Sequence, residues 1–304
     1  MVQNILIAGS SGLVGSRLKS ELKEAGYNVK SLVRRTPINS SEVKWDPANN
    51  KLDSSVFEHI DAVINLSGSP IAETNWDSAG KENLINSRVN TTRLLAEKMS
   101  ETENKPSLMI NASAVGYYGN RPSEADLSEN SKPGSGFLPN LVQKWESATQ
   151  KAKDSGIKVS SLRFANILSK DGGIIAKLKP LFQIGMTSPL GSGKQKMPWV
   201  SLRDVVDSIV HVIKNEDNPN LQGAINVASP QTVDNKEFTQ SLSKALNRIA
   251  CPLPVPEVAI KTTMGEKGQE LLLNDVNVSS KKLEDSGFVF KDQDLTEFLN
   301  KELS

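Results

Sequence analysis

The first residues whose types and spacing suggest chemistry are glycines near the N-terminus. Gly9, Gly12 and Gly15 come directly after the apolar run NILIA at residues 4–8. In such a turn the first glycine allows a sharp change of direction, the second lets the backbone approach a pyrophosphate, and the third lets a helix pack closely on the strand. The free N–H groups and dipole of that helix favour an anion. The spacing therefore predicts a dinucleotide site, and a tight turn that binds nothing is the alternative. The predicted pyrophosphate-binding residues are Gly9, Ser10, Ser11, Gly12, Leu13, Val14 and Gly15.

The residues after the second predicted strand indicate which dinucleotide would bind. Arg34 and Arg35 follow the strand over 29–33, where an NAD site usually places an acidic residue against the ribose hydroxyls. Because guanidinium groups suit a 2′-phosphate, we predict NADP(H) over NAD(H). A solvated loop is the alternative for this pair. Asp46 follows a short predicted strand over 43–45, where it would accept a hydrogen bond from the adenine amino group or serve as a turn aspartate.

A second concentration of polar side chains follows the predicted strand over 108–112. Ser113 is followed by Tyr117 and Tyr118, with Gly116 and Gly119 among them. Two of the three tyrosines in the chain lie in this short stretch. Such a concentration is more typical of a functional site than of a core, so we treat Ser113, Tyr117 and Tyr118 as candidate catalytic residues.

The elements that position these residues follow an alternating pattern. Continuous apolar runs predict strands over 4–8, 29–33, 43–45, 61–66, 108–112, 157–166 and 223–228. Apolar residues at helical spacing predict helices over 14–25, 85–99, 137–152, 201–213, 234–246, 254–264 and most of 275–303. Residues 124–136 are predicted to be a loop, and the glycine- and lysine-bearing segment between 169 and 199 has no clear period.

The alternation of strands and helices predicts an α/β fold. We expect a Rossmann-like, doubly wound parallel sheet with a small, mainly helical C-terminal cap. The predicted nucleotide-binding domain covers 1–168, with 200–228 returning to it, and the substrate or cap region covers 169–304.

Composition narrows the class of protein. The chain of 304 residues has a formal net charge of +1, so no broad basic face for nucleic acid is expected. Cys251 is the only cysteine, which excludes an intrachain disulfide and predicts a reducing compartment, the cytoplasm or another intracellular one. No apolar run reaches the length of a membrane span. Because the first strand begins at residue 4, we expect no signal or transit peptide.

Metal catalysis is not expected from the sequence. His59 and His211 are the only histidines, and neither lies near Cys251 or closely spaced carboxylates. The predicted partner is a small-molecule substrate, with no nucleic acid and no membrane, and the chain is expected to be a monomer or a homodimer.

Several strings together carry a family resemblance. The chain resembles the atypical, epimerase-like subfamily of extended short-chain dehydrogenase/reductases, which is related to nucleoside-diphosphate-sugar epimerases and often labelled SulA-type. The resemblance covers nearly the whole chain. The strings are the glycine turn at 9–15, NLSGSPI at 65–71 with Trp76, SRV at 87–89, ASAVGYYG at 112–119, PLGSG at 189–193 and SGF at 286–288.

The resemblance implies a cofactor, an activity and further site residues. It implies an NADP(H)-dependent oxidoreductase or epimerase acting on a small carbonyl or hydroxyl compound or on a nucleotide sugar. It places Arg34 and Arg35 at the 2′-phosphate and Asp46 at the adenine. The other residues that it implies for cofactor binding are Leu66, Ser67 and Gly68 at the ribose, Arg163 and Asn166 at the nicotinamide side, and Arg88.

One departure from the family pattern bears on catalysis. Short-chain dehydrogenases use a tyrosine with a lysine four residues later, and the lysine lowers the tyrosine pKa. Four residues beyond Tyr27, Tyr117 and Tyr118, the only tyrosines of the chain, stand Ser31, Arg121 and Pro122, so this dyad is absent. In one hypothesis Ser113 orients a carbonyl and Tyr117 or Tyr118 donates the proton. In the other, the chain is a non-catalytic NADP(H)-binding sensor or regulatory module.

The long irregular segment offers a candidate substrate pocket. Its cationic side chains would pair with a polar or anionic ligand, or they are simply solvated. The residues concerned are Lys177, Lys194, Lys196, Met197, Trp199 and Arg203.

Overall fold

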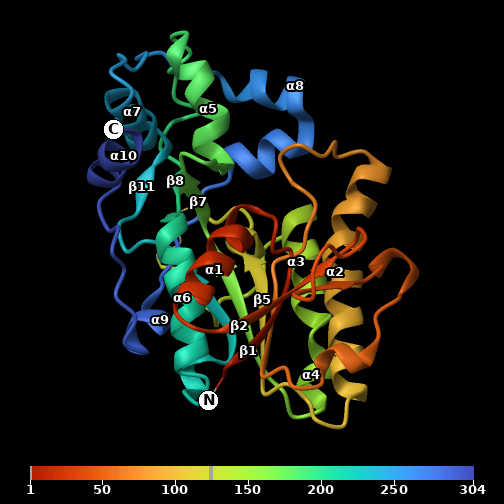
Figure 1. The fold of residues 1–304 in the computed structure, drawn as a ribbon. Coiled ribbons are helices and arrows are strands. Elements are labelled where there is room, and N and C mark those ends of the chain that lie inside the picture. The colour runs from red at the N-terminus through yellow and green to blue at the C-terminus, as the bar shows by residue number, and fades with distance from the viewer. Residues whose placement is uncertain (1, 123–125) are drawn as a thin grey trace. The chain divides into compact units, whose positions relative to one another are not determined.

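The chain divides into two compact units, which are drawn in Figure 1. The computed structural model describes residues 2–122 and 126–304, so residues 124 and 125 of the predicted loop lie outside the described part. The first unit contains residues 1–114, 141–163 and 206–225, and the second contains 115–140, 164–205 and 226–304. The second unit thus includes residues 115–140, which were predicted to belong to the nucleotide-binding domain. The functional division of the chain stays a prediction.

The first unit is built on a parallel sheet. Within the described residues this sheet has seven strands in the order β10-β6-β5-β4-β1-β2-β3. The strands are β1 (Asn4–Ala8), β2 (Asn28–Val33), β3 (Glu42–Lys44), β4 (Ala62–Asn65), β5 (Leu108–Ala114), β6 (Lys158–Phe164) and β10 (Gly223–Val227). The end of β6 and the end of β10 fall in the second unit.

The strand order reverses beside β1. This strand pairs in parallel with β2 on one side and with β4 on the other. In open α/β sheets, ligands bind at the carboxyl ends of the strands at such a reversal. The predicted doubly wound, Rossmann-like sheet is confirmed, and the glycine turn lies at its switch point.

Helices cover both faces of this sheet. They are α1 (Leu13–Glu24), α2 (Ser78–Glu101), α3 (Phe137–Ser147), α4 (Gln150–Asp154) and α6 (Leu202–Lys214). Leu94 and Met99 of α2 and Ala152 of α4 pack with Leu6 and Met109 of the sheet in one buried cluster. Figure 1 shows α1 and α6 on the opposite face. The central strands, which are buried along nearly their whole length, therefore have a helical partner on each side.

The predicted helix over 137–152 is two helices. The break falls at Thr149, whose Oγ1 donates to the carbonyl oxygen of Glu146 at 2.7 Å. Because Thr and Ser side chains compete with the helical backbone for hydrogen bonds, a threonine at this position is compatible with the end of α3. Apolar spacing continued across the break, which is why periodicity alone predicted one helix.

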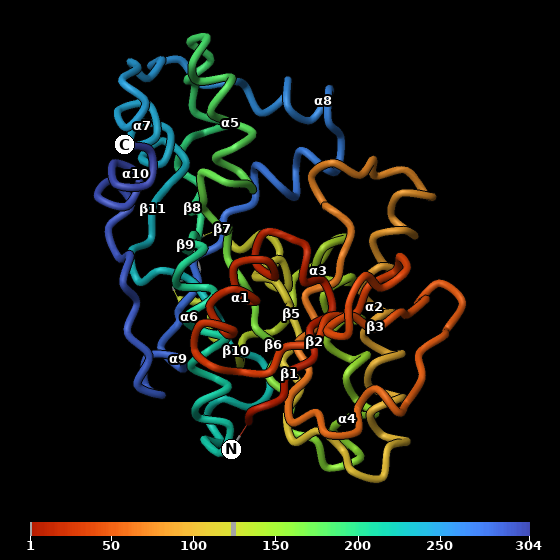
Figure 2. Tube along the Cα trace, viewed as in Figure 1, coloured from red at the N-terminus to blue at the C-terminus, as the bar shows by residue number. Residues whose placement is uncertain are grey.

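The second unit has short strands and several helices, whose path is traced in Figure 2. Its strands are β7 (Asn166–Ser169), paired with β9 (Trp199–Ser201), and β8 (Lys196–Met197), paired with β11 (Val233–Asp234). Its helices are α5 (Gly173–Gln183), α7 (Asn235–Ala245), α8 (Glu257–Gly268), α9 (Lys281–Asp285) and α10 (Leu295–Leu303). Trp199 is fully buried in its core, with its ring 5.5 Å from that of Phe298.

Two parts of the second unit differ from prediction. Helix α5 was not predicted, because Gly172 precedes it, Gly173 is its first residue and Pro180 lies inside it. The region 275–303, predicted to be mainly helical, contains only the short α9 and the later α10. Gly287, with φ of +93°, follows the end of α9 and favours that termination.

Within residues 2–122 and 126–304, no helix combines the length and the apolar character needed to cross a membrane.

Candidate functional site

The turn between β1 and α1 requires glycine at two of its three glycine positions. Gly9 has φ of +82°, and a Cβ there would lie 2.7 Å from the carbonyl carbon of Leu66. A Cβ on Gly15 would lie 2.2 Å from the carbonyl oxygen of Gly9. Both contacts are with backbone atoms, so neither can be relieved by a side-chain rotation. These two glycines are explained by packing of the turn within the protein.

Gly12 is different, because the protein itself has room for a side chain there. Its φ is −75°, which any residue adopts, and a Cβ would meet only the carbonyl oxygen of Gly9 at 3.5 Å. That distance is an ordinary van der Waals contact. Packing within the chain therefore leaves Gly12 unexplained, whereas close approach of a pyrophosphate to the backbone would require a glycine.

The first turn of α1 is open to an anion. Its N-cap is Gly12, which offers no side-chain hydrogen bond, and no acidic residue lies in the first turn. By contrast, the N-cap residues of α2, α7 and α10 are Asp77, Asp234 and Asp294, whose carboxylates accept from backbone N–H groups. The early N–H groups of α1 are thus not capped by a side chain and carry the positive end of the helix dipole.

The two arginines after β2 differ in their partners. The guanidinium of Arg35 donates to both carboxylate oxygens of Glu42, at 2.7 and 2.6 Å. The hydrogen bond from Arg35 is the main cause that lowers the pKa of Glu42 to about 2. Arg34 is exposed and has no hydrogen bond or ion pair within the part of the chain that the structure describes. Arg34 is therefore the readier of the two to bind a phosphate.

Asp46 caps a short turn. Its carboxylate accepts from the backbone N–H of Asn49 at 3.3 Å and from Asn49 Nδ2 at 2.7 Å. The side-chain hydrogen bond is the main cause that lowers the pKa of Asp46. The turn-aspartate alternative thus describes its contacts in the chain, and a contact with adenine stays a prediction.

The loop after β4 is held by a buried polar network that the sequence did not reveal. Asn65 Oδ1 accepts from the N–H of Ser67 at 3.2 Å, and Asn65 Nδ2 donates to Thr92 and to Asn111, each at 2.8 Å. Trp145 Nε1 donates to the same Thr92 hydroxyl at 3.0 Å. The loop at 66–68 touches the glycine turn. These hydrogen bonds connect it through Asn65 to α2, α3 and β5. The four partners lie up to 80 residues apart, so local patterns gave no signal.

Arg88 of α2 lies against this same loop. Its Nη2 donates to the carbonyl oxygen of Ser69 at 2.9 Å, and its Nη1 donates to that of Leu84 at 3.2 Å. The guanidinium carbon lies 5.3 Å from the centroid of the Trp145 ring. Burial lowers the pKa of Arg88 to about 10. No carboxylate pairs with it among the described residues.

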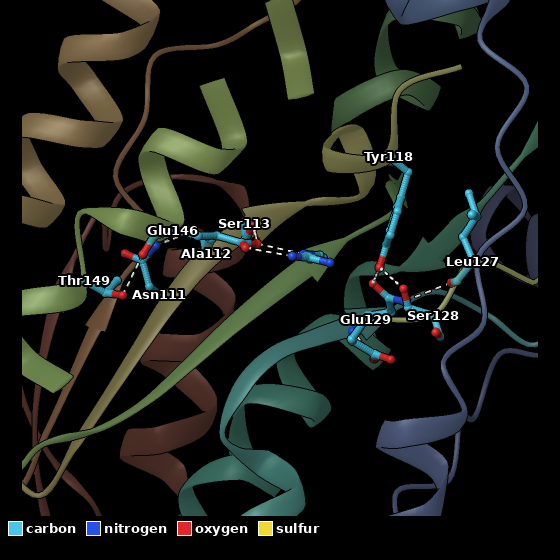
Figure 3. Close-up of polar contacts among 11 residues, drawn as sticks. Asn111, Ala112, Ser113, Tyr118, Leu127, Ser128, Glu129, Glu146 and Thr149 are labelled. Atoms are coloured by element: carbon cyan, nitrogen blue, oxygen red, sulfur yellow. Dashed lines mark hydrogen bonds and ion pairs between the residues drawn. The ribbon is translucent and has the colours of Figure 1, made fainter. Parts of the chain in front are cut away.

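Ser113, at the end of β5, is engaged with a carboxylate, as Figure 3 shows. Its hydroxyl donates to Glu146 Oε1 at 2.6 Å. Arg163 donates from Nε and Nη2 to the two oxygens of the same carboxylate, each at 2.8 Å, and its side chain is only 3% exposed. A hydroxyl has one proton, so the Ser113 oxygen can only accept a further hydrogen bond. Arg163, predicted at the nicotinamide side, serves in the structure to hold Glu146.

Tyr118 is engaged inside the second unit. Its ring is fully buried, and its hydroxyl lies 2.7 Å from Asn226 Oδ1 and 3.1 Å from the carbonyl oxygen of Ser128 (Figure 3). Tyr117 meets the Tyr118 ring edge to face, with centroids 5.3 Å apart, and is itself partly exposed. Of the two predicted tyrosines, only Tyr117 is accessible.

The remaining predicted residues lie in the second unit. Asn166 Nδ2 donates to the carbonyl oxygen of Pro198 at 2.9 Å. Lys177 and Lys194 are exposed, as the solvated alternative expects. The pocket prediction is wrong for Trp199, because the indole is fully buried and its Nε1 donates to the carbonyl oxygen of Gln231 at 3.1 Å. In the described residues, His, Cys, Asp and Glu form no group of three or more that could hold a metal ion.

The sheet order and the glycine turn at its switch point define a protein of the Rossmann-like, dinucleotide-binding class. Residues 5–228 match the model of the NAD dependent epimerase/dehydratase family, and residues 255–302 match a domain of unknown function, DUF1731. The chain belongs to the NAD dependent epimerase/dehydratase family, which confirms the resemblance inferred from the sequence.

Relatives match the chain along nearly its whole length. Epimerase family protein Mb2239 of Mycobacterium bovis is 40% identical over 97% of this chain and 96% of its own length. Human epimerase family protein SDR39U1 is 30% identical over 94% of each chain. The crystal structure of human SDR39U1 (isoform 2) with NADPH superimposes with a TM-score of 0.88 at 26% identity, covering 99% of each chain.

More distant structures share the fold. UDP-glucuronic acid 4-epimerase from Bacillus cereus, in complex with UDP-glucuronic acid and NAD, has a TM-score of 0.77 at 19% identity, covering 99% of this chain and 98% of that one.

Proposed function

We propose that the chain is an NADP(H)-dependent oxidoreductase or epimerase that acts on a small carbonyl or hydroxyl compound or on a nucleotide sugar. The observation that carries the proposal is the open first turn of α1, with Gly12 at its N-cap. The protein has room for a Cβ at Gly12, and no carboxylate caps the helix. A pyrophosphate accounts for both features, because it needs close backbone approach and is favoured by the helix dipole.

The preference for NADP(H) is supported by Arg34. An exposed guanidinium at the end of β2 can pair with a 2′-phosphate, whereas NAD sites usually place an acidic residue there. The NADPH in the structure of the human relative agrees with this prediction. Arg35 is a weaker candidate, since it must leave Glu42 before it binds a phosphate.

The other predicted cofactor contacts, apart from Arg88, remain part of this proposal. Leu66, Ser67 and Gly68 lie on the loop that the Asn65 network holds beside the glycine turn. Asp46 would meet the adenine, and Asn166 would lie toward the nicotinamide. Arg163 acts through Glu146 and Ser113 rather than by direct contact.

For the chemistry, bound NADP(H) would supply or take up the hydride. While Ser113 donates to ionised Glu146, its oxygen accepts a hydrogen bond from a substrate hydroxyl. This role differs from the expectation that Ser113 donates to a carbonyl. Tyr117, the accessible tyrosine, would donate or accept the proton, with general acid–base assistance of typically about 10²–10⁴-fold.

A non-catalytic NADP(H)-binding module is the second candidate, and one observation favours it. The hydroxyls of Ser113 and Tyr118 are both engaged within the protein, and no lysine stands four residues after either tyrosine. Such a protein would keep the cofactor site without needing a proton donor.

The experiment that tests the proposal has two stages. NADPH is titrated into the purified protein, and its absorbance is then followed in the presence of aldehydes, ketones and nucleotide sugars. The oxidoreductase proposal expects binding followed by oxidation with at least one compound. Epimerisation is followed separately by the appearance of the epimer of a nucleotide sugar. Tight binding without either reaction supports the binding module, and absence of NADPH binding contradicts both.

A further inference from the structure

Arg88 is a partly buried cation without a charged partner. A guanidinium has five N–H donors, and the structure occupies two of them, with the carbonyl oxygens of Ser69 and Leu84. No acceptor for the other three lies in the described residues. Buried charges are normally paired, because their desolvation is costly otherwise. The lowered pKa of Arg88 has burial as its only cause, in agreement with the missing carboxylate.

The surroundings of Arg88 hold its guanidinium in place. One side faces the Trp145 ring, at 5.3 Å from its centroid, and Trp145 is itself fixed through Thr92. A Cβ on Gly68 would lie 3.1 Å from the same guanidinium carbon. Gly68 therefore makes room for the cation. A fixed, planar group with free donors is well suited to bind carboxylate or phosphate oxygens.

The location places this cation against the loop that lies beside the glycine turn. Gly68 follows Leu66 and Ser67, the backbone of which a Cβ on Gly9 would contact. In the proposed cofactor site the first turn of α1 holds the pyrophosphate and Arg34 holds the 2′-phosphate. On that assignment Arg88, which the family resemblance places among the cofactor-binding residues, is left for an anionic group of the substrate.

We propose that Arg88 binds a carboxylate or phosphate group of the substrate, so that the substrate of this site is an anion. This inference rests on the proposed cofactor site, because the assignment of the cofactor phosphates is what leaves Arg88 to the substrate. Among the compounds considered, it favours phosphorylated or carboxylated molecules, including nucleotide sugars, over neutral aldehydes and ketones.

The test begins with the cofactor. NADPH affinity and thermal midpoint are measured for the wild type, Arg88→Met and Arg93→Met. Arg93 is an exposed arginine of the same helix, bonded to Asn90, so it controls for the loss of one charge on α2. The inference expects similar NADPH affinities for all three proteins. Loss of NADPH affinity in a stable Arg88→Met protein would assign Arg88 to the cofactor pyrophosphate and overturn the inference.

Anions are then titrated by calorimetry into each protein saturated with NADP⁺, at constant ionic strength. The probes are inorganic phosphate, D-glucuronate and UDP-glucuronic acid, with D-glucose as the neutral control. The wild type and Arg93→Met are expected to bind at least one anionic probe, and Arg88→Met about tenfold or more weakly, as expected for loss of a charge-assisted hydrogen bond. Binding of phosphate but not glucuronate would indicate that Arg88 recognises a phosphate group, and the reverse would indicate a carboxylate.

Two further variants test the same contact in case Arg88→Met does not fold. Arg88→Lys keeps the charge but loses the planar fork, so partial retention of anion binding is expected. Gly68→Ala leaves Arg88 unchanged but displaces its guanidinium, so weaker anion binding is expected. Wild-type protein that binds none of the anions, or Arg88 and Gly68 variants that bind them unchanged, would overturn the inference. Failure of the cofactor proposal is seen separately, as wild-type protein that does not bind NADPH.

Discussion

The segments that follow β1 and β4 differ from the end of β5 in how many of their polar groups already have partners within the protein. After β1 and β4, the first turn of α1 has no side-chain cap and Arg88 has no carboxylate partner. At the end of β5, the Ser113 hydroxyl donates to Glu146, and Tyr118, which follows the strand, contacts Asn226. Groups that the protein does not satisfy itself are candidates for ligand binding. The comparison therefore supports cofactor binding more strongly than it supports any particular proton donor.

The largest expected effect is a loss of stability when the ion pair between Glu146 and Arg163, which holds Ser113, is broken. Arg163→Met removes the partner of Glu146, whose side chain is 17% exposed. Because this leaves a largely buried carboxylate unpaired, we expect a loss of about 3–5 kcal/mol in the free energy of unfolding, measured with urea at neutral pH. Arg17→Met is the control, since its pair with Glu21 is much more exposed, at 59% for Arg17, and should cost at most about 1 kcal/mol. Equal losses in both variants would show that the Ser113 region is not held in this way.

The glycine turn should respond differently at its second and third glycines. Gly15→Ala forces a Cβ to within 2.2 Å of a carbonyl oxygen, so we expect destabilisation of about 1–3 kcal/mol together with loss of NADPH binding. Gly12→Ala has room in the protein, so its thermal midpoint should hardly change while NADPH binds about tenfold or more weakly. Unchanged NADPH affinity in Gly12→Ala would remove the main support for a pyrophosphate at this turn.

Replacing Tyr118 should mainly lower stability, whereas replacing Tyr117 should mainly lower turnover. Tyr118→Phe leaves Asn226 Oδ1 without its buried donor, and we expect a loss of about 1–3 kcal/mol in unfolding free energy. If the chain is an oxidoreductase, Tyr117→Phe should lower the rate of NADPH oxidation about 10²-fold or more. Full turnover in Tyr117→Phe would contradict its role as the proton donor.

The smallest expected effect is the change in cofactor affinity when one of the two adjacent arginines, Arg34 or Arg35, is replaced. Arg34→Ala should weaken NADPH binding about tenfold while leaving NADH binding unchanged, because a charge-assisted contact to the 2′-phosphate is lost. Arg35→Ala should have a smaller effect, since Arg35 is held by Glu42, whose pKa near 2 keeps it ionised at neutral pH. The reverse order, with Arg35 the more important, would mean that cofactor binding breaks the pair with Glu42.

Local patterns predicted the fold and the position of the glycine turn well. The strand at residues 4–8, the glycines after it and the following helix are adjacent in sequence, so spacing was sufficient to find them. Helix α5 was not predicted, because the glycines at its start and Pro180 are also typical of a loop. Trp199 was predicted to line a pocket, but it lies in a core. Apolar spacing also continued across the end of α3.

The partners of the candidate catalytic residues could not be predicted in this way. Tyr118 and Asn226 are 108 positions apart, and the Asn65 network joins residues from β4, α2, β5 and α3. Their proximity depends on the packing of whole elements. The sequence therefore identified Ser113 and Tyr118 as polar residues in a suggestive stretch, but the structure was needed to see that their hydroxyls are engaged.

The measurement that tests the central claim most directly is a calorimetric titration of the wild-type protein with NADPH and, separately, with NADH. An open helix N-terminus together with the exposed Arg34 predicts one NADPH bound per chain, with NADH bound at least about tenfold more weakly. Equal affinities would contradict the role of Arg34. Absence of binding by either nucleotide would contradict the assignment of the glycine turn as a dinucleotide site.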